Sequence, residues 1–185
     1  MTSKFVEIGH ISWIEVSKCD PRAKEIAVRH YSFRPVKSRK MGGEVGPPGQ
    51  KIVMLTRNEK ALWGSHRPAP WSGIRRMDGF NGPCCFIFRN EGSDILSSTL
   101  IREAVAVTML KWTEEADGLL TYVAVDHIKS TNSGYCFLQA GFQHIGYTNS
   151  RKLGTLRKLV IPTDEIQGCI EEYQWRQKRN GLSSV

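Results

Sequence analysis

The chain has 185 residues, 40% of them hydrophobic and 24% charged, and it carries a formal net charge of +8. These values are those of a globular domain, and the absence of any run of about 18 apolar residues excludes a membrane span. Five cysteines without a framework spacing indicate a reducing cytoplasm, and we interpret all five as buried fillers rather than metal ligands. The positive charge favours an anionic partner, such as nucleic acid or a phosphorylated cofactor.

The first half of the chain predicts strands around one helix. Strand-like composition or apolar runs occur in four segments, residues 5–16, 51–57, 61–66 and 84–88. Asp20 and Pro21 predict the start of a helix that ends near His30, because Asp is a good N-cap and Pro is favoured at the first helical position. Two segments rich in Gly and Pro, 41–50 and 67–83, are expected to be mobile loops.

The second half predicts alternating helices and strands. The longest helix is expected over residues 99–115, with Ser97 or Ser98 as its N-cap. The later elements are a buried strand over 119–125 that ends at Asp126, a short helix over 134–140 capped by Thr131, Asn132 or Ser133, a helix stop at Gly141, strands over 142–147 and 153–161, and a C-terminal helix over 163–185.

These elements predict one α/β (α+β) domain over residues 1–185, with a central, mixed, mostly antiparallel sheet flanked by helices. Two junctions lead from a strand into a helix, residues 89–98 and 126–132. Ligands of open α/β sheets bind outside the carboxyl ends of strands, where helix N-termini offer free N–H groups. We therefore expect the functional site at these two junctions.

The second junction resembles the C-terminal motif of the GNAT (GCN5-related N-acetyltransferase) fold. The matching residues are Asn132, the helix over 135–140, Gly141-Phe142 and Gly146. The resemblance implies acetyl-CoA or another acyl-CoA as cofactor, with Asn132 and the helix, including Phe137, along its pantetheine arm.

Two features depart from that family. The first junction lacks the family's Gly-rich loop, because Arg89-Asn90-Glu91-Gly92 holds only one glycine. The position of the usual tyrosine acid holds Phe137, so a tyrosine acid is either absent or displaced to Tyr135.

The chain also resembles the phage Mom-type group, a GNAT-like set that modifies adenine in duplex DNA and protects phage DNA from restriction. The residues that carry this resemblance are His30-Tyr31-Ser32, Arg89 followed by Ser97-Ser98, and Asp126. It implies a phage or prophage protein that acts on DNA in the host cytoplasm. It further implies catalytic roles for Tyr31, Arg89, Asp126 and, more weakly, Tyr135, and cofactor contacts for Ser97, Ser98, Asn132 and Phe137.

Basic and aromatic residues alternate between Arg29 and Lys40, a pattern that can stack on bases and bind phosphates. The predicted DNA-binding residues are His30, Ser32, Arg34, Lys37, Arg39 and Lys40. Each candidate also has a structural reading, since Tyr31 can be a core tyrosine, Asp126 a turn cap, and Ser97 and Ser98 helix caps.

Three functions therefore stay open. The chain is an acyl-CoA-dependent transferase that modifies a nucleobase amine, an acetyltransferase for a small amine or a protein, or a non-catalytic domain that binds nucleic acid or a host protein. No metal is predicted, although His30 and Asp126 from separate segments leave one conceivable. The sequence leaves the oligomeric state open.

Overall fold

The computed structural model describes residues 8–33, 43–47, 49–67, 79–112, 116–128 and 131–181. Its strands are β1 (Ile8–Gly9), β2 (Trp13–Val16), β3 (Gln50–Thr56), β4 (Ala61–Arg67), β5 (Cys84–Asn90), β6 (Leu119–Ala124), β7 (Gln143–Ser150) and β8 (Gly154–Ile161). Its helices are α1 (Pro21–Val28), α2 (Ser97–Lys111), α3 (Tyr135–Gln139) and α4 (Thr163–Arg179), and a 3₁₀ turn, η2, spans Val125–His127.

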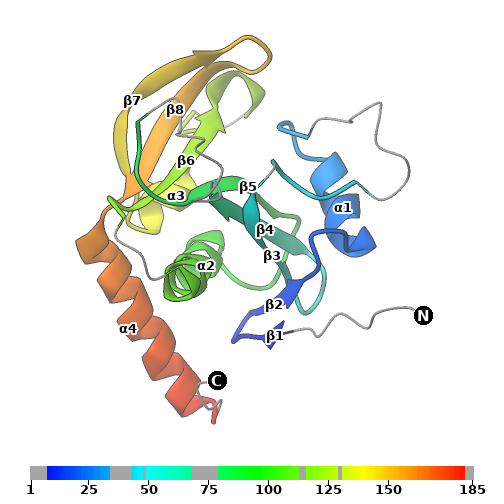
Figure 1. The fold of residues 1–185 in the computed structure, drawn as a ribbon, viewed down its shortest axis with the longest axis vertical. Helices are drawn as coiled ribbons and strands as arrows, with labels where there is room; N and C mark the ends of the chain where they lie inside the picture. Colours follow the sequence, from blue (N-terminus) through cyan, green and yellow to red (C-terminus); the bar gives the residue numbers. More distant parts are fainter. Residues whose placement is uncertain are drawn as a thin grey trace.

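The strands form one sheet of eight in the order β1-β2-β3-β4-β5-β6-β8-β7 (Figure 1). Each neighbouring pair is antiparallel except β5 and β6, which run parallel and are joined through α2. This mixed, mostly antiparallel sheet flanked by helices confirms the predicted fold class. In the described parts of the chain, no helix combines the length and the apolarity needed to cross a membrane.

Alternation along the strands gives the sheet two apolar faces. Val53 and Leu55 of β3 pack with Ile26 and Ala27 of α1 on one face. The residues between them, such as Met54, belong to the larger core on the other face, which α2, α3 and α4 cover (Figure 1). The start of α1 is as predicted, with Oδ1 of Asp20 accepting a hydrogen bond from Arg22 N at 2.8 Å.

Several predicted boundaries and caps are wrong. The helix predicted over 99–115 is α2, which spans Ser97–Lys111. It has 15 residues and is not the longest helix, because α4 has 17. The N-cap of α2 is Leu96, without a side-chain cap, so neither Ser97 nor Ser98 caps it. The Ser97 hydroxyl instead accepts a hydrogen bond from Asn90.

The predicted cap of α3 is also wrong, because its N-cap is Gly134 in the left-handed region, at φ 83°. Asn132 accepts a hydrogen bond from Arg157 instead, which removes its side chain from a capping role. Gly141 does follow the helix at φ 101°, as its predicted stop requires. Among the cysteines, Cys19 is exposed rather than a buried filler.

Candidate active site between the splayed strands

The parallel strands β5 and β6 pair over only a short distance. Their register joins Cys84 to Leu120 and Cys85 to Thr121, although β5 continues to Asn90 and β6 to Ala124. On its other edge β5 is irregular, since Cys85 faces Ser65 of β4 and Ile87 faces Gly64, which leaves Phe86 as an extra residue. Such a bulge bends a strand and increases its local twist. The two strands therefore separate beyond Cys85.

Two glycines make room for the bulged residue. A Cβ atom on Gly64 would lie 2.4 Å from the Phe86 ring and 2.7 Å from the Ile87 side chain. A Cβ atom on Gly46 would also lie 2.4 Å from that ring. The aromatic ring of Phe86 thus lies close to the backbone of both glycines, at the point where β5 leaves β6.

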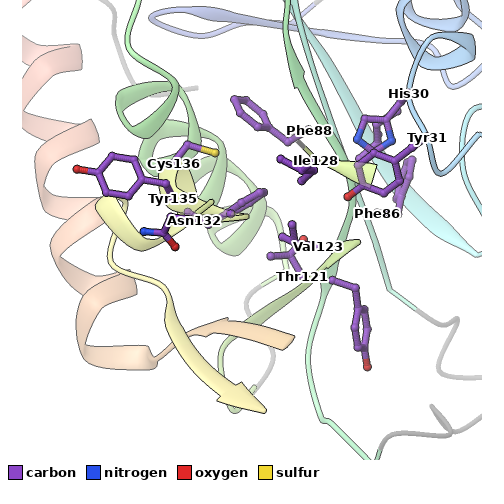
Figure 2. Close-up of a pocket in the computed structure, with 14 residues that line it drawn as sticks. His30, Tyr31, Phe86, Phe88, Thr121, Val123, Ile128, Asn132, Tyr135 and Cys136 are labelled. Atoms are coloured by element: carbon purple, nitrogen blue, oxygen red, sulfur yellow. The ribbon is translucent and has the colours of Figure 1, made fainter. Parts of the chain in front are cut away.

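The gap between the strands holds a pocket of about 260 Å³ (Figure 2). Its walls come from β5, β6, α3 and the turn that follows α1, and they are mainly apolar and aromatic. The described lining contains no carboxylate. A pocket of this kind suits a flat or apolar group with few polar contacts.

Three neighbouring rings connect the turn after α1 to η2, and two of them, His30 and Tyr31, line the pocket. The centroids of His30 and Tyr31 lie 4.1 Å apart, and Tyr31 stacks on His127 at 5.7 Å with an interplanar angle of 17°. Figure 2 shows His30 and Tyr31 side by side at the edge of the pocket. His127 was not among the predicted site residues, although its place directly after the strand-terminal Asp126 was an available signal.

His30 is held as a neutral ring. Its Nδ1 accepts a hydrogen bond from Ser32 N at 3.2 Å and lies 2.7 Å from the Ser32 hydroxyl. A backbone N–H only donates, so the ring proton belongs on Nε2. Burial, with a smaller contribution from Arg89, lowers the pKa of His30 to about 4. His30 therefore presents an N–H donor at neutral pH, and Ser32 orients it from behind.

Tyr31 holds the end of β6 by its hydroxyl. The oxygen accepts a hydrogen bond from Ala124 N at 3.4 Å. Burial raises the pKa of Tyr31, so the phenol stays protonated at neutral pH and its own proton is available for donation. Tyr31 is thus half-buried with its hydroxyl in a hydrogen bond, which is close to its structural reading, and it also lines the pocket.

Arg89 lies next to the pocket rather than in its lining. Its Nε donates to Glu91 at 2.5 Å, and Arg29 donates to the same carboxylate at 2.7 and 2.9 Å. The two arginines, Arg29 first, lower the pKa of Glu91 to about 2. The bond to Glu91 uses only the Nε of Arg89, so its terminal nitrogens can face a further anion.

Asp126 and Tyr135 lie at the periphery. Asp126 is exposed, and its Oδ2 accepts a hydrogen bond from Thr155 N at 3.0 Å, so it fixes the start of β8. It is outside the described pocket lining. Tyr135 lines the rim and is 54% exposed. The structure thus brings His30, Tyr31 and Tyr135 to one pocket and leaves Asp126 at its border.

The predicted cofactor residues fall into two groups. Asn132 and Phe137 line the pocket, where Phe137 packs edge-on against Phe88 at 5.8 Å. Ser97 and Ser98 form the first turn of α2, which has no side-chain cap. The backbone N–H groups of this turn have no partner within the helix.

The loop before α2 is folded onto Asn90. The Oδ1 atom of Asn90 accepts hydrogen bonds from the backbone N–H of Gly92 at 3.2 Å and from that of Ser93 at 2.8 Å. An amide side chain therefore occupies donors that a Gly-rich loop would offer to a ligand, and the anion-binding groups that remain here are those of the α2 N-terminus.

The other predicted DNA-binding residues, Arg34, Lys37, Arg39 and Lys40, lie outside the described residues. The pocket also uses residues that the sequence analysis did not select, Phe86, Phe88, Thr121, Tyr122 and Cys136. The alternating aromatic residues in Cys85-Phe86-Ile87-Phe88 were the available signal for two of them. No group of three or more His, Cys, Asp or Glu side chains that could hold a metal occurs within the described ranges.

Comparisons with known proteins give weak matches only. No family model and no curated protein matches the chain. Among solved structures, aminoglycoside acetyltransferase AAC(6')-Ib in complex with coenzyme A is 13% identical, with a TM-score of 0.44 over 64% of this chain and 68% of that one. AAC(6')-Ib in complex with ribostamycin and coenzyme A is also 13% identical, with a TM-score of 0.43 over 63% and 65%. Because these TM-scores are low, the site is interpreted from its own geometry.

Proposed function

We propose that this protein is an acyl-CoA-dependent transferase that modifies an amine of a nucleobase in DNA. The observation that carries the proposal is the pocket between two parallel strands that separate at a bulge, with an uncapped helix N-terminus after the first strand. The resemblance of residues 132–146 to the GNAT motif, and of His30-Tyr31-Ser32, Arg89 and Asp126 to the Mom-type group, supports the same reading.

The residues present fit a coenzyme A thioester. The separated edges of β5 and β6 offer backbone groups along which an amide-containing chain can bind, next to Asn132 and Phe137. The first turn of α2, at Ser97 and Ser98, offers N–H groups to a pyrophosphate. When bound, the thioester supplies an activated acyl carbonyl.

The reaction needs one nucleophile and two proton transfers. A bound acyl-CoA would supply its acyl carbon to the amine nitrogen, so that a C–N bond would form as the C–S bond breaks and coenzyme A leaves as its thiolate. We propose that Tyr31 donates the proton that the leaving sulfur receives, because its phenol is protonated and lines the pocket. The surplus proton of the amine passes to Asp126 or to water, and Tyr31 regains from solvent the proton that it gives to sulfur. His30 donates from Nε2 to an acceptor on the bound ring or to the developing oxyanion.

The pocket favours a neutral aromatic acceptor. A polycationic amine would be bound best by carboxylates, and the described lining has none. The His30 and Tyr31 rings, which line the pocket, instead provide an aromatic wall for a flat base. A base inside a duplex must be flipped out to reach such a pocket, and a chain of net charge +8 favours the DNA backbone as partner.

One observation favours a second candidate. Because Asn90 occupies two loop donors, a non-catalytic domain that binds nucleic acid without coenzyme A is the alternative. This alternative predicts DNA binding with a steep salt dependence and no binding of a coenzyme A thioester.

The test is mass spectrometry of nucleosides digested from the DNA of cells that express the protein. We expect a nucleoside heavier by one acyl-derived group, absent with the empty vector and reduced with Asp126→Asn. Titration calorimetry with acetyl-CoA and with coenzyme A accompanies it. If the protein binds coenzyme A but the DNA is unchanged, the acceptor is a small amine or a protein instead. If it neither binds coenzyme A nor alters DNA, the transferase is refuted.

A further inference from the structure

The hairpin formed by β7 and β8 lies at the edge of the sheet. Along β7, residues 143–145 and 147–149 are exposed, so both faces of this strand meet solvent. Ile145 is 51% exposed and Tyr147 is 60% exposed. Figure 1 shows the two strands extending together past the helices toward one end of the molecule. An edge strand that is open on both faces is available to a partner.

The charged residues within the hairpin are all basic, and the Asp126 carboxylate lies against the start of β8 at Thr155. No Asp or Glu occurs between Asp126 and Asp164, in a chain that holds 18 acidic residues. Arg151 and Lys152 form the exposed turn of the hairpin, and Lys158 lies on β8. Within the described residues, no carboxylate forms an ion pair with any of these three. The hairpin therefore presents uncompensated positive charge.

The hairpin is fixed to the border of the pocket. Asp126 of η2 accepts a hydrogen bond from Thr155 N, directly after the turn of the hairpin. The next residue, His127, stacks on Tyr31 in the pocket wall. At the other end of η2, β6 pairs with β8 along its whole length. A ligand held by the hairpin would thus extend into the pocket region.

We propose that the β7–β8 hairpin is a ribbon that binds duplex DNA beside the target base. A two-stranded ribbon fits the major groove, which is about 12 Å wide. Arg151 and Lys152 contact phosphates, and Tyr147 and His144, whose rings lie 4.6 Å apart, face the groove or the bases next to the flipped one. The inference rests on the proposed function in one respect, because it takes DNA as the substrate.

A second copy of the chain is the less favoured occupant. Pairing of two β7 edges would bring two positively charged hairpins together, and like charges oppose such contacts. The polyanionic backbone of DNA is complementary to the same surface.

The test compares two charge-reversed variants in DNA binding. Arg151→Glu with Lys152→Glu reverses the turn of the hairpin, and Lys178→Glu with Arg179→Glu reverses an adjacent exposed pair at the end of α4. Figure 1 shows these two sites at opposite ends of the molecule. Both variants change the net charge equally. Binding to a labelled 30-base-pair duplex is measured at several salt concentrations, with acetyl-CoA affinity, sedimentation and thermal unfolding as further readouts.

We expect the hairpin variant to bind DNA about 10-fold or more weakly near 0.1 M salt, with a salt slope smaller by about 2, whereas the α4 variant keeps most of its affinity. Acetyl-CoA affinity stays unchanged in both variants, and the unfolding midpoint falls slightly in the α4 variant alone, because the last turn of a helix favours cations and Arg179 lies over the Trp175 ring. Equal losses in both variants, or none, would overturn the ribbon while the transferase stands. A dimer that the hairpin variant dissociates would identify a second copy as occupant. A wild-type protein that binds acetyl-CoA but no DNA would refute the DNA substrate itself.

Discussion

At the scale of single residues, burial sets the protonation of the two rings in the pocket wall. His30 is neutral because transfer of an imidazolium from water is costly and Arg89 adds a repulsive charge. Tyr31 stays protonated because burial disfavours the charged phenolate and so raises its pKa. The pair thus provides two N–H or O–H donors and no formal charge, which suits a site that handles a neutral ring and a leaving thiolate.

Tyr31→Phe tests the assigned proton donor. The variant keeps the ring stack but loses the hydroxyl, so we expect kcat to fall by about 10²-fold or more. The lost hydrogen bond to Ala124 N costs about 1 kcal/mol of stability. Acetyl-CoA affinity by calorimetry should change little, and Tyr173→Phe, which loses a hydrogen bond to His10 outside the described pocket lining, is the matched control. An unchanged kcat would remove Tyr31 from the chemistry.

Local rules predicted some residues well and others not. The cap at Asp20 and the stop at Gly141 follow from their own geometry and sequence neighbours, so both were predictable. Asn132 was wrongly assigned as a cap because Arg157, 25 residues away, binds its side chain. His127 was missed for a related reason, since its stacking partner Tyr31 comes from a different part of the chain.

At the scale of elements, the bulge in β5 positions the pocket. Apolar runs predicted β3, β4, β5 and β6, because each strand is identified by its own composition. The bulge at Phe86 was not predictable in this way, since it depends on the register with β4 and on the space above Gly64. The place where two strands separate is a property of a strand pair.

Gly64→Ala tests this arrangement. The new methyl group would lie 2.4 Å from the Phe86 ring, so the ring or the strand must move. We expect a loss of about 1–3 kcal/mol in unfolding free energy and at least 10-fold weaker acetyl-CoA binding. Both are measured by chemical denaturation and calorimetry.

Gly168→Ala provides the control for this prediction. Gly168 lies in α4, where the nearest atom to an added Cβ is 3.9 Å away. Alanine should be neutral or stabilising there, by up to about 1 kcal/mol, because it is the better helix former. If Gly64→Ala behaves like Gly168→Ala, the bulge does not depend on the glycine.

At the scale of the whole molecule, one buried carboxylate connects three distant segments. Glu103 of α2 is 2% exposed, and its Oε1 accepts a hydrogen bond from Ser12 N at 2.7 Å. Its Oε2 lies 3.8 Å from Arg176 of α4. Nearby, Tyr173 of α4 is hydrogen-bonded to His10 at 2.9 Å. The first strands and the last helix are therefore joined through polar groups that the core must keep satisfied.

Glu103→Gln tests the cost of that carboxylate. Burial raises the pKa of Glu103, so the folded protein binds its proton more tightly than the unfolded chain. Its contribution to stability is therefore present at low pH and is lost as the pH rises through the folded-state pKa. Glutamine keeps an acceptor for Ser12 and carries no charge. We expect the variant to gain on the order of 1 kcal/mol relative to wild type between pH 5 and pH 8.

Chemical denaturation at both pH values measures this difference. Glu171→Gln, at an exposed position of α4, is the control and should show no such trend. If the difference in stability between wild type and Glu103→Gln does not change with pH, Arg176 stabilises the Glu103 carboxylate in the folded protein as well as water does in the unfolded chain.

The short ladder between β5 and β6 also divides the sheet into two halves. Strands β1 to β5 are consecutive neighbours, and β6, β8 and β7 form a second group. In the described sheet, the ladder between the two groups has two registered residue pairs, Cys84 with Leu120 and Cys85 with Thr121. A ligand that contacts the separated edges of both β5 and β6 would thus bridge the shortest connection between the two groups of strands. Its binding free energy would add to the free energy of unfolding.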